Sequence, residues 1–250
     1  MAGRISYLGG IVKDGLVLDL DAAKIQSYPR TGTLWNDISG NRNNGTLANF
    51  SSPSPQTIWN PNNGGSIVFD GTDDYGEAQR NITLRPDYVT ICAWVKYTGG
   101  QNLSFIGGCG NTGTAGYSLY INCSGGIPNN FGFIAGNGNL IGGGTPSVNF
   151  GTPGVSTINY ICGTFDGSFL RGYQNGVLRN TVTQPTPGPL VYPTTGGSPI
   201  LGGMFVGIIE SSISVSRYWT GNIFQIKVYN RALSAAEILQ NYNATKGRYL

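Results

Sequence analysis

The sequence predicts an all-β fold, and the clearest sign is a strand that runs into a glycine-hinged turn. Residues 66–75 read S-I-V-F-D-G-T-D-D-Y, and Ile67 and Phe69 alternate with their neighbours as in a pleated strand. Asp70-Gly71 ends the strand, because glycine tolerates the positive φ of a tight turn.

Two further observations support the same fold class. Asn175-Gly176 stands between apolar-alternating runs at 168–174 and 177–183, and this dipeptide is the strongest short-range signal of a β-hairpin. The 250 residues include 40 Gly, 14 Tyr, 10 Phe and 4 Trp, a composition rich in turn and strand formers. A chain of this length can bury a substantial core.

The remaining elements follow from the same alternation. The segment at 15–22 places Leu16, Leu18 and Leu20 on one face and Asp19 and Asp21 on the other, which we interpret as a solvated face. Segment 29–65 is rich in loops, and 136–154 is rich in glycine. Other predicted strands lie at 66–70, 88–97, 103–107, 117–122, 131–135, 158–165, 168–174, 177–183, 198–202 and 222–230.

One helix is predicted, over residues 231–242. Ser234 and Glu237 have the spacing of a capping box, and Leu233 and Ile238 occupy the flanking positions that pack across it. This helix is expected to close one end of the β structure.

The chain is interpreted as one domain, residues 14–250, preceded by an arm at 1–13 that Gly9-Gly10 interrupts. No Pro/Ser-rich linker separates two self-sufficient halves. The arm could add a strand to a neighbouring protein or clamp it.

Charge and targeting signals narrow the partners. The net charge is +3 without a dense Lys/Arg run, so neither nucleic acid nor an anionic membrane is an expected partner. The N-terminus lacks the apolar region of a secretory signal, and no stretch is long enough for a membrane span. We therefore expect synthesis in a cytoplasm, with release by another route such as lysis.

The four cysteines show no C-x-x-C pair, which argues against zinc. Cys92 and Cys162 lie inside predicted strands, and we expect them to be small buried thiols rather than a disulfide, given a reducing site of synthesis.

Three blocks in order carry a family resemblance. They read G-L-V-L-D-L-D-A with W-N-D-I-S-G-N-R-N-N-G-T-L (within 15–47), S-I-V-F-D-G-T-D-D-Y (66–75), and G-N-I-F-Q-I-K-V-Y-N-R-A-L-S-A-A-E-I (221–238). Over about residues 15–245 the chain resembles the laminin G-like jelly rolls of the concanavalin A-like lectin/glucanase superfamily. The resemblance implies an antiparallel two-sheet jelly-roll sandwich with loops along a rim.

The resemblance is closest to the variety found in virion proteins of tailed bacteriophages. It implies a virion location and a structural or adhesive role, as a capsid decoration or accessory protein that contacts capsid or tail neighbours and other copies of itself. The alternatives are a receptor-binding tail fibre or tailspike domain that recognises host surface polysaccharide, and a bacterial lectin-like adhesin domain. The absence of a repetitive shaft in the sequence favours the decoration or accessory role.

The superfamily also contains glycosidases, but this sequence argues against catalysis. Its three glutamates, Glu77, Glu210 and Glu237, do not form the E-x-D-x-x-E pattern of the family's glucanases. A retaining hydrolase needs two carboxylates about 5–5.5 Å apart. The chain has no histidine to activate a serine or cysteine nucleophile. The expectation is a protein that is not an enzyme.

Some laminin G-like relatives bind Ca²⁺ at the rim through aspartates and carbonyls. Asp70, Asp73 and Asp74 cluster in one predicted turn and offer hard oxygen ligands. The alternative is that Asp70 and Asp73 cap the turn through their side chains. Calcium is the one cofactor under consideration.

For glycan binding, the sequence points to Arg217, Tyr218 and Trp219, just before the last strand, where the family has a rim loop. Aromatic rings stack on the apolar face of a sugar, while Arg or Asn bonds to its hydroxyls. Tyr75, Trp35 and Trp59 are weaker candidates, and core packing is the alternative for every tryptophan.

Overall fold

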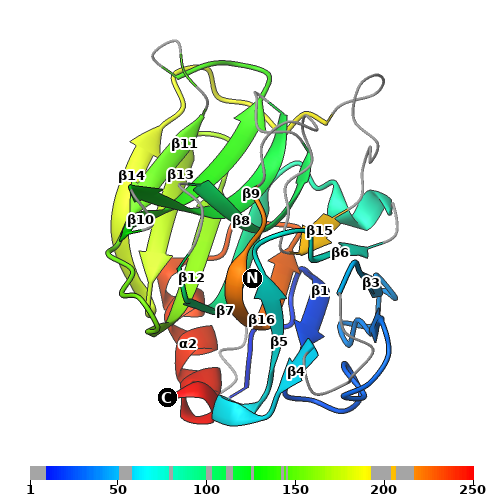
Figure 1. Cartoon of the computed structure of the whole chain (residues 1–250). Helices are drawn as coiled ribbons and strands as arrows, with labels where there is room; N and C mark the ends of the chain where they lie inside the picture. Colours follow the sequence, from blue (N-terminus) through cyan, green and yellow to red (C-terminus); the bar gives the residue numbers. More distant parts are fainter. Residues whose placement is uncertain are drawn as a thin grey trace.

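The computed structural model shows two antiparallel sheets packed face to face, with one long helix against the outside of one sheet (Figure 1). This confirms the predicted two-sheet sandwich. The structure describes residues 10–50, 58–78, 81–99, 103–110, 115–124, 127–141, 144, 146–192, 204–206 and 217–250.

Sheet A is organised around β16 (Thr220–Tyr229), whose first half pairs with β5 and whose second half pairs with β1, while β7 runs along its other edge. The strand order is β14-β13-β12-β7-β16-β5-β4, with β1 joined to β16. The other bounds are β1 (Leu16–Asp21), β4 (Trp59–Asn60), β5 (Ser66–Asp70), β7 (Val89–Tyr97), β12 (Ile158–Phe165), β13 (Phe169–Gln174) and β14 (Val177–Thr183).

Sheet B has the order β11-β10-β9-β8-β15-β6-β3-β2. Two short 3₁₀ turns, η1 (Asn62–Gly64) and η2 (Ile82–Leu84), lie in the connections, and the helix is α2 (Ala235–Tyr249). The sheet B bounds are β2 (Leu34–Trp35), β3 (Gly45–Ala48), β6 (Tyr75–Ala78), β8 (Leu103–Gly110), β9 (Ala115–Ser124), β10 (Ile127–Asn137), β11 (Ser147–Phe150) and β15 (Met204–Val206).

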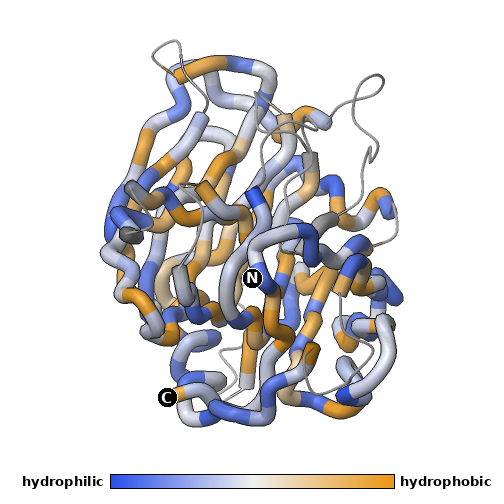
Figure 2. The backbone as a smooth tube through the Cα atoms, viewed as in Figure 1, coloured by the Kyte–Doolittle hydropathy of each residue, from blue (hydrophilic) through white to orange (hydrophobic). Residues whose placement is uncertain are grey.

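The core lies between the sheets and is built by strict alternation, visible as interleaved apolar and polar segments along the strands in Figure 2. In β7, Val89, Ile91, Ala93 and Val95 face this core, as the sequence predicts. The opposite face of β7 belongs to a second apolar cluster, beneath α2.

Close contact between the sheets depends on glycines of sheet A. The ring of Phe133, in β10, lies over Gly163, and the ring of Phe150, in β11, lies over Gly172. A β-carbon at either glycine would collide with the ring. These two positions therefore set how near the sheets approach.

Most predicted strands are confirmed, some with longer bounds, and β5 and β12 match the predicted ranges. The predicted strand at 198–202 lies outside the described residues. Strands also form where the sequence predicts loops: β2, β3 and β4 within 29–65, and β11 within the glycine-rich span. These are strands of two to four residues, too short to show an alternation of apolar and polar residues in the sequence.

The predicted capping box at the helix start is confirmed. Ser234 accepts a hydrogen bond from the Glu237 amide, and the Glu237 carboxylate accepts one from the Ser234 amide. The helix continues to Tyr249, seven residues beyond the predicted end, because Thr245 and Tyr249 are also buried against sheet A.

The prediction of a solvated face for Asp19 and Asp21 is wrong, since both side chains are fully buried. The helix covers this face, and opposite charges accompany the carboxylates. Lys227 Nζ lies 3.3 Å from Asp19 Oδ1, and Arg248 Nη1 lies 2.7 Å from Asp21 Oδ2. Gln225 of β16 donates hydrogen bonds to both carboxylates. The Asp21–Arg248 pair joins sheet A to the helix, whereas the Asp19–Lys227 pair lies within the sheet.

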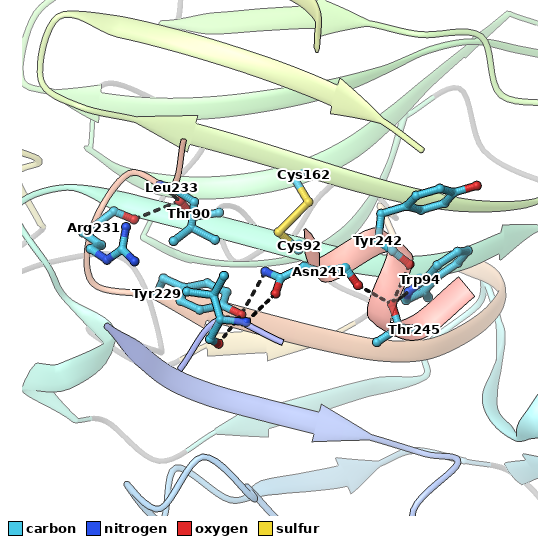
Figure 3. The surroundings of a disulfide bond; sticks show 11 residues. Thr90, Cys92, Trp94, Cys162, Tyr229, Arg231, Leu233, Asn241, Tyr242 and Thr245 are labelled. Atoms are coloured by element: carbon cyan, nitrogen blue, oxygen red, sulfur yellow. Dashed lines mark hydrogen bonds between the residues drawn. A yellow bond between two sulfur atoms is a disulfide. The ribbon is translucent and has the colours of Figure 1, made fainter. Parts of the chain in front are cut away.

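The expectation of separate thiols at Cys92 and Cys162 is also wrong, because the structure joins them in a disulfide (Figure 3). The two residues face each other in register on β7 and β12, with Cα atoms 4.1 Å apart. That pairing joins positions 70 residues apart and cannot be derived from their spacing in the sequence. Cys109 and Cys123 are buried thiols.

Around the disulfide, polar bonds attach the helix to sheet A (Figure 3). Trp94 Nε1 donates to Thr245 Oγ1 at 2.8 Å, and Asn241 Nδ2 donates to Tyr229 Oη at 3.0 Å. The described end of the predicted arm joins the same contact, since the Val12 amide donates to Asn241 Oδ1 at 2.8 Å. Residues 1–9 of the arm lie outside the described part.

Among the described residues, no helix has both the length and the apolar character needed to cross a membrane.

The glycine contacts between the sheets lead to a stability prediction. Gly163→Ala should lower the free energy of unfolding by about 1–3 kcal/mol, because the added methyl group overpacks the core against Phe133. The control Gly247→Ala, in α2 with open space around its α-carbon, should instead raise it by about 0.5–1 kcal/mol. Urea unfolding measures both, and a Gly163→Ala protein as stable as wild type would contradict the packing described.

Candidate functional site

The outer face of sheet B carries a small apolar cluster that is separate from the core. Alternation sends Leu119 and Ile121 of β9 inward, and it sends Tyr120 outward. Tyr120 pairs across the strands with Phe105 of β8, and Ile134 of β10 completes the cluster. All three side chains are buried, with 1–6% of their surface exposed, so the cluster forms the base of this outer face.

A glycine lets the tyrosine lie flat on this face. Tyr120 pairs with Gly132 of β10, and the Tyr120 ring occupies the space where a β-carbon of Gly132 would stand. The Phe105 and Tyr120 ring centroids are 5.4 Å apart, with the rings tilted by 39°. Both rings are buried, with 1% and 6% of their surface exposed, so they form the base of this face across β8 and β9.

This surface lines a pocket of about 300 Å³, a volume that suits one or two sugar rings. The pocket is bounded by apolar groups of β8 and β10 and by polar groups of β9, β11 and the segment before β16. The lining residues are Leu103, Phe105, Tyr120, Asn122, Ile134, Ser147 and Arg217.

Amide side chains form one wall of the pocket. Tyr120 Oη donates to Asn149 Oδ1 at 2.9 Å, and Asn122 Nδ2 lies within hydrogen-bond distance of both Asn149 Oδ1 and Asn130 Oδ1. Burial raises the pKa of Tyr120, so its hydroxyl stays protonated and donates at neutral pH. The wall therefore offers fixed donors and acceptors beside an apolar floor.

Arg217 lies at the pocket and is the predicted site residue that the structure places there. Its guanidinium carbon is 5.8 Å from the centroid of the Phe105 ring. Its main-chain carbonyl accepts a hydrogen bond from the Phe105 amide at 2.9 Å. That backbone bond fixes residue 217 beside β8.

The other predicted glycan residues do not join this pocket. Trp219 is fully buried in the main core, 5.6 Å from the Tyr97 ring, so it stabilises the fold and presents no ring to a ligand. Tyr218 is half-buried next to it, and Tyr75 stands at the start of β6, also half-buried. Residues 217 and 219 lie in the segment before β16, which is not a strand, so strand alternation does not place them on one face, and Arg217 lies at the pocket while Trp219 lies in the core.

The weaker tryptophan candidates lie elsewhere. Trp35 is fully buried in the core. Trp59 is half-buried, donates from Nε1 to the Ala22 carbonyl at 3.0 Å, and carries the Arg30 guanidinium 4.6 Å from its ring centroid.

Sequence reasoning missed Phe105, Tyr120, Asn122 and Ser147. The pattern Y-S-L-Y-I-N over residues 117–122 does indicate that Tyr120 and Asn122 share a face. It does not indicate which face is outward or which strands lie beside it, and those two facts create the pocket.

A second candidate site is the acidic turn between β5 and β6. The carboxylate oxygens offered by Asp70, Asp73 and Asp74 all lie within 4.8 Å of one another. Asp70 Oδ1 accepts a hydrogen bond from the Thr72 amide at 2.7 Å. This bond is the side-chain cap of the turn that the sequence offers as the alternative to calcium binding at Asp70. Gly71 has φ +79°, as its predicted turn role requires.

Asp74 is the buried member of this turn. Its Oδ2 accepts a hydrogen bond from the Asp70 amide at 2.9 Å, whereas its Oδ1 is buried with no hydrogen-bond partner within the described chain. Burial, with repulsion from Asp70 and Asp73, raises the pKa of Asp74 to about 6. Three clustered carboxylates and an unbonded buried oxygen fit a hard cation such as Ca²⁺.

Several solved structures share this architecture at low sequence identity. Domain 4 of AbnA, an extracellular arabinanase from Geobacillus stearothermophilus in complex with arabinotriose, aligns with a TM-score of 0.61 and 13% identity, covering 91% of this chain and 98% of that domain. Trypanosoma rangeli sialidase, in complex with the inhibitor DANA, aligns with a TM-score of 0.60 and 15% identity over 93% of this chain. This chain spans only 33% of that sialidase.

The binding domain of botulinum neurotoxin DC, in complex with SialylT, aligns with a TM-score of 0.63 and 13% identity, covering 93% of this chain and 52% of that one. At these identities the likeness shows the fold alone. No curated protein matches the chain.

A family profile provides the assignment. The profile described as the concanavalin A-like lectin/glucanases superfamily, of laminin G type, matches residues 70–239. The match runs from the acidic turn through the pocket strands to α2, and it agrees with the two-sheet architecture. The chain is therefore a member of the laminin G-like group of the concanavalin A-like lectin/glucanase superfamily.

Proposed function

We propose that this protein is a carbohydrate-binding module that holds a glycan in the pocket on the outer face of sheet B. The observation that carries the proposal is the combination of an aromatic and aliphatic floor with an amide wall in a pocket of about 300 Å³. A sugar ring has an apolar face and a polar rim, so both surfaces have a partner here.

The structural neighbours support this class of ligand. The AbnA domain was solved in complex with arabinotriose, and the neurotoxin binding domain in complex with SialylT. Because the identities are near 13%, these proteins support a general glycan-binding role and do not indicate which sugar is bound.

We propose that the protein acts by binding and not by hydrolysis. None of the described residues that line the pocket carries a carboxylate. Glu237 belongs to the helix cap, and the Arg231 guanidinium holds the pKa of Glu237 at about 2, so this carboxylate stays ionised and cannot act as a general acid. Glu77 lies in β6, away from the pocket lining, and Glu210 is outside the described residues.

We propose that the module serves as a structural or adhesive virion protein, a capsid decoration or accessory protein of a tailed phage. The sequence blocks at 15–47, 66–75 and 221–238 support this context, and residues 1–9 of the arm are available in sequence to contact a neighbour. The alternatives are a receptor-binding fibre or tailspike domain and a bacterial adhesin domain.

Location separates these three roles. The proposal predicts that mass spectrometry of purified particles finds the chain at a copy number matching capsid subunits or their symmetry axes. A copy number matching the tail tip would favour the fibre. Recovery only in the bacterial envelope would refute a virion role.

We also propose that the acidic turn binds Ca²⁺ through Asp70, Asp73 and Asp74. The cation would neutralise the mutual repulsion of three carboxylates in the connection between β5 and β6.

The pocket proposal predicts a selective loss of affinity. Asn122→Ala should weaken binding of an oligosaccharide identified on a glycan array by about five- to tenfold, because one or two hydrogen bonds to the sugar are lost. The matched control Asn243→Ala removes an exposed amide from α2 and should leave affinity unchanged. Isothermal titration calorimetry measures both. Equal affinities for the two variants and wild type would contradict this pocket as the site.

The acidic turn predicts a pH-dependent stability difference. Because the pKa of Asp74 is raised from 3.8 to about 6, the folded state favours the protonated carboxyl, and its contribution to stability falls as pH rises from about 4 to about 6. Asp74→Asn should therefore gain stability relative to wild type across that range, by up to about 3 kcal/mol. Millimolar Ca²⁺ at pH 7 should raise the melting temperature of wild type but not of Asp74→Asn.

Thermal unfolding at several pH values tests this, with the exposed Asp14→Asn as the control. A melting temperature of wild type that does not respond to Ca²⁺ would remove the cation from the proposal, while leaving the pH effect standing by itself.

A further inference from the structure

Among the described residues that line the pocket, Arg217, from the segment before β16, is the charged one. The four strands β8 to β11, whose outer faces form the floor and walls, contain no Asp, Glu, Lys or Arg. Within the described chain Arg217 therefore has no acidic partner of the kind that partly buried arginines usually have.

The backbone of Arg217 is fixed by a hydrogen bond, and its side chain has a donor that no described residue uses. Its carbonyl accepts a hydrogen bond from Phe105, and its guanidinium lies over the Phe105 ring. Its Nε is buried without a hydrogen-bond partner among the residues that the structure describes. Neither an ion pair nor a side-chain hydrogen bond from this guanidinium to a described residue is present, in contrast to Arg231 and Arg248.

We infer that the pocket selects an acidic sugar, whose carboxylate pairs with Arg217 while its ring occupies the pocket that Tyr120, Asn122 and Ser147 line. The inference rests on the proposed function and specifies its ligand class. A guanidinium edge presents two parallel N–H donors that match the two oxygens of a carboxylate, so a sugar acid satisfies the buried Nε and neutralises the charge in one contact.

The other residues of the pocket favour a sugar acid over a small free anion as the ligand. Asn122 of β9, which pairs with Leu103 of β8, and Ser147 of β11 offer hydrogen-bonding groups to hydroxyls. A small anion would contact the arginine alone and leave the apolar floor and these polar groups unused.

Paired ligands give the sharpest test. The probes are 3′-sialyllactose and trigalacturonic acid, each compared with its own methyl ester, which keeps the sugar and removes the charge. Affinities are measured by calorimetry for wild type, Arg217→Gln and Arg217→Lys. Arg179→Gln, an exposed arginine on β14 of the other sheet, is the matched control.

Wild type and Arg179→Gln should bind at least one acid ten or more times more tightly than its ester, with an affinity for the acid that falls as salt is raised. Arg217→Gln should bind acid and ester equally, and Arg217→Lys should retain part of the preference because it keeps the charge but not the paired donors. Melting temperatures establish that each variant is folded. The two acids distinguish a sialic acid from a uronic acid as the source of the carboxylate.

Two results would overturn the inference and leave glycan binding intact: equal affinity of wild type for acid and ester, or an acid preference that persists in Arg217→Gln. If wild type binds no member of a glycan array, acidic or neutral, the proposed function itself fails and the inference fails with it.

Discussion

Aromatic rings resting on glycines are the contact on which the rest of this structure depends. Phe133 and Phe150 of sheet B lie over Gly163 and Gly172 of sheet A. Because these glycines have no side chain, the rings can approach sheet A closely, and this contact sets the spacing between the sheets. The same device is used on the outside, where Tyr120 lies over Gly132. Strand β10 takes part in both, since Phe133 points into the core and the adjacent Gly132 accepts the tyrosine. The packing that fixes β10 in the core therefore also fixes the floor of the pocket.

The two outer faces of the sandwich have different roles for physical reasons. The outer face of sheet A is covered by α2, and the buried carboxylate of Asp21 pairs with Arg248 of the helix, while Asp19 pairs with Lys227 within the sheet. Losing one partner of such a pair would leave a buried charge uncompensated, so displacing the helix would be strongly unfavourable in free energy. The disulfide between Cys92 and Cys162 lies in the same layer. The outer face of sheet B instead carries the pocket, with an arginine that has no such partner in the described chain. The proposed binding surface is therefore the outer face of sheet B, which α2 does not cover.

Much of the fold could be predicted from the sequence because its signals are local. Alternation in 66–70, 88–97 and 158–165, the Asn175-Gly176 turn, and the Ser234 and Glu237 cap each depend on residues adjacent in the chain. The failures have a common cause in long-range contacts. Asp19 and Asp21 look solvated until a helix more than 200 residues later covers them, and Cys92 and Cys162 look independent until β7 and β12 pair in register.

The candidate site divides in the same way. The acidic turn is local, and its three aspartates come together as the sequence predicts. Arg217 was predicted as a glycan residue and lies at the pocket, but Trp219 faces the core, because two residues of one segment can lie on opposite sides of a sheet layer. Tyr120, Asn122 and Ser147 could not be identified, since they meet only through the order β8-β9-β10-β11.

The central claim, that the outer face of sheet B is the ligand-binding surface, is tested most directly by NMR. Amide spectra of the ¹⁵N-labelled protein are followed as an oligosaccharide that binds is added. The account predicts that the side-chain amides of Asn122 and Asn149 and the backbone of β9 to β11 shift most, and that α2 and β14 stay unchanged. Saturable shifts confined to α2, β14 or the loops between sheet A strands, with none in β9 to β11, would contradict it.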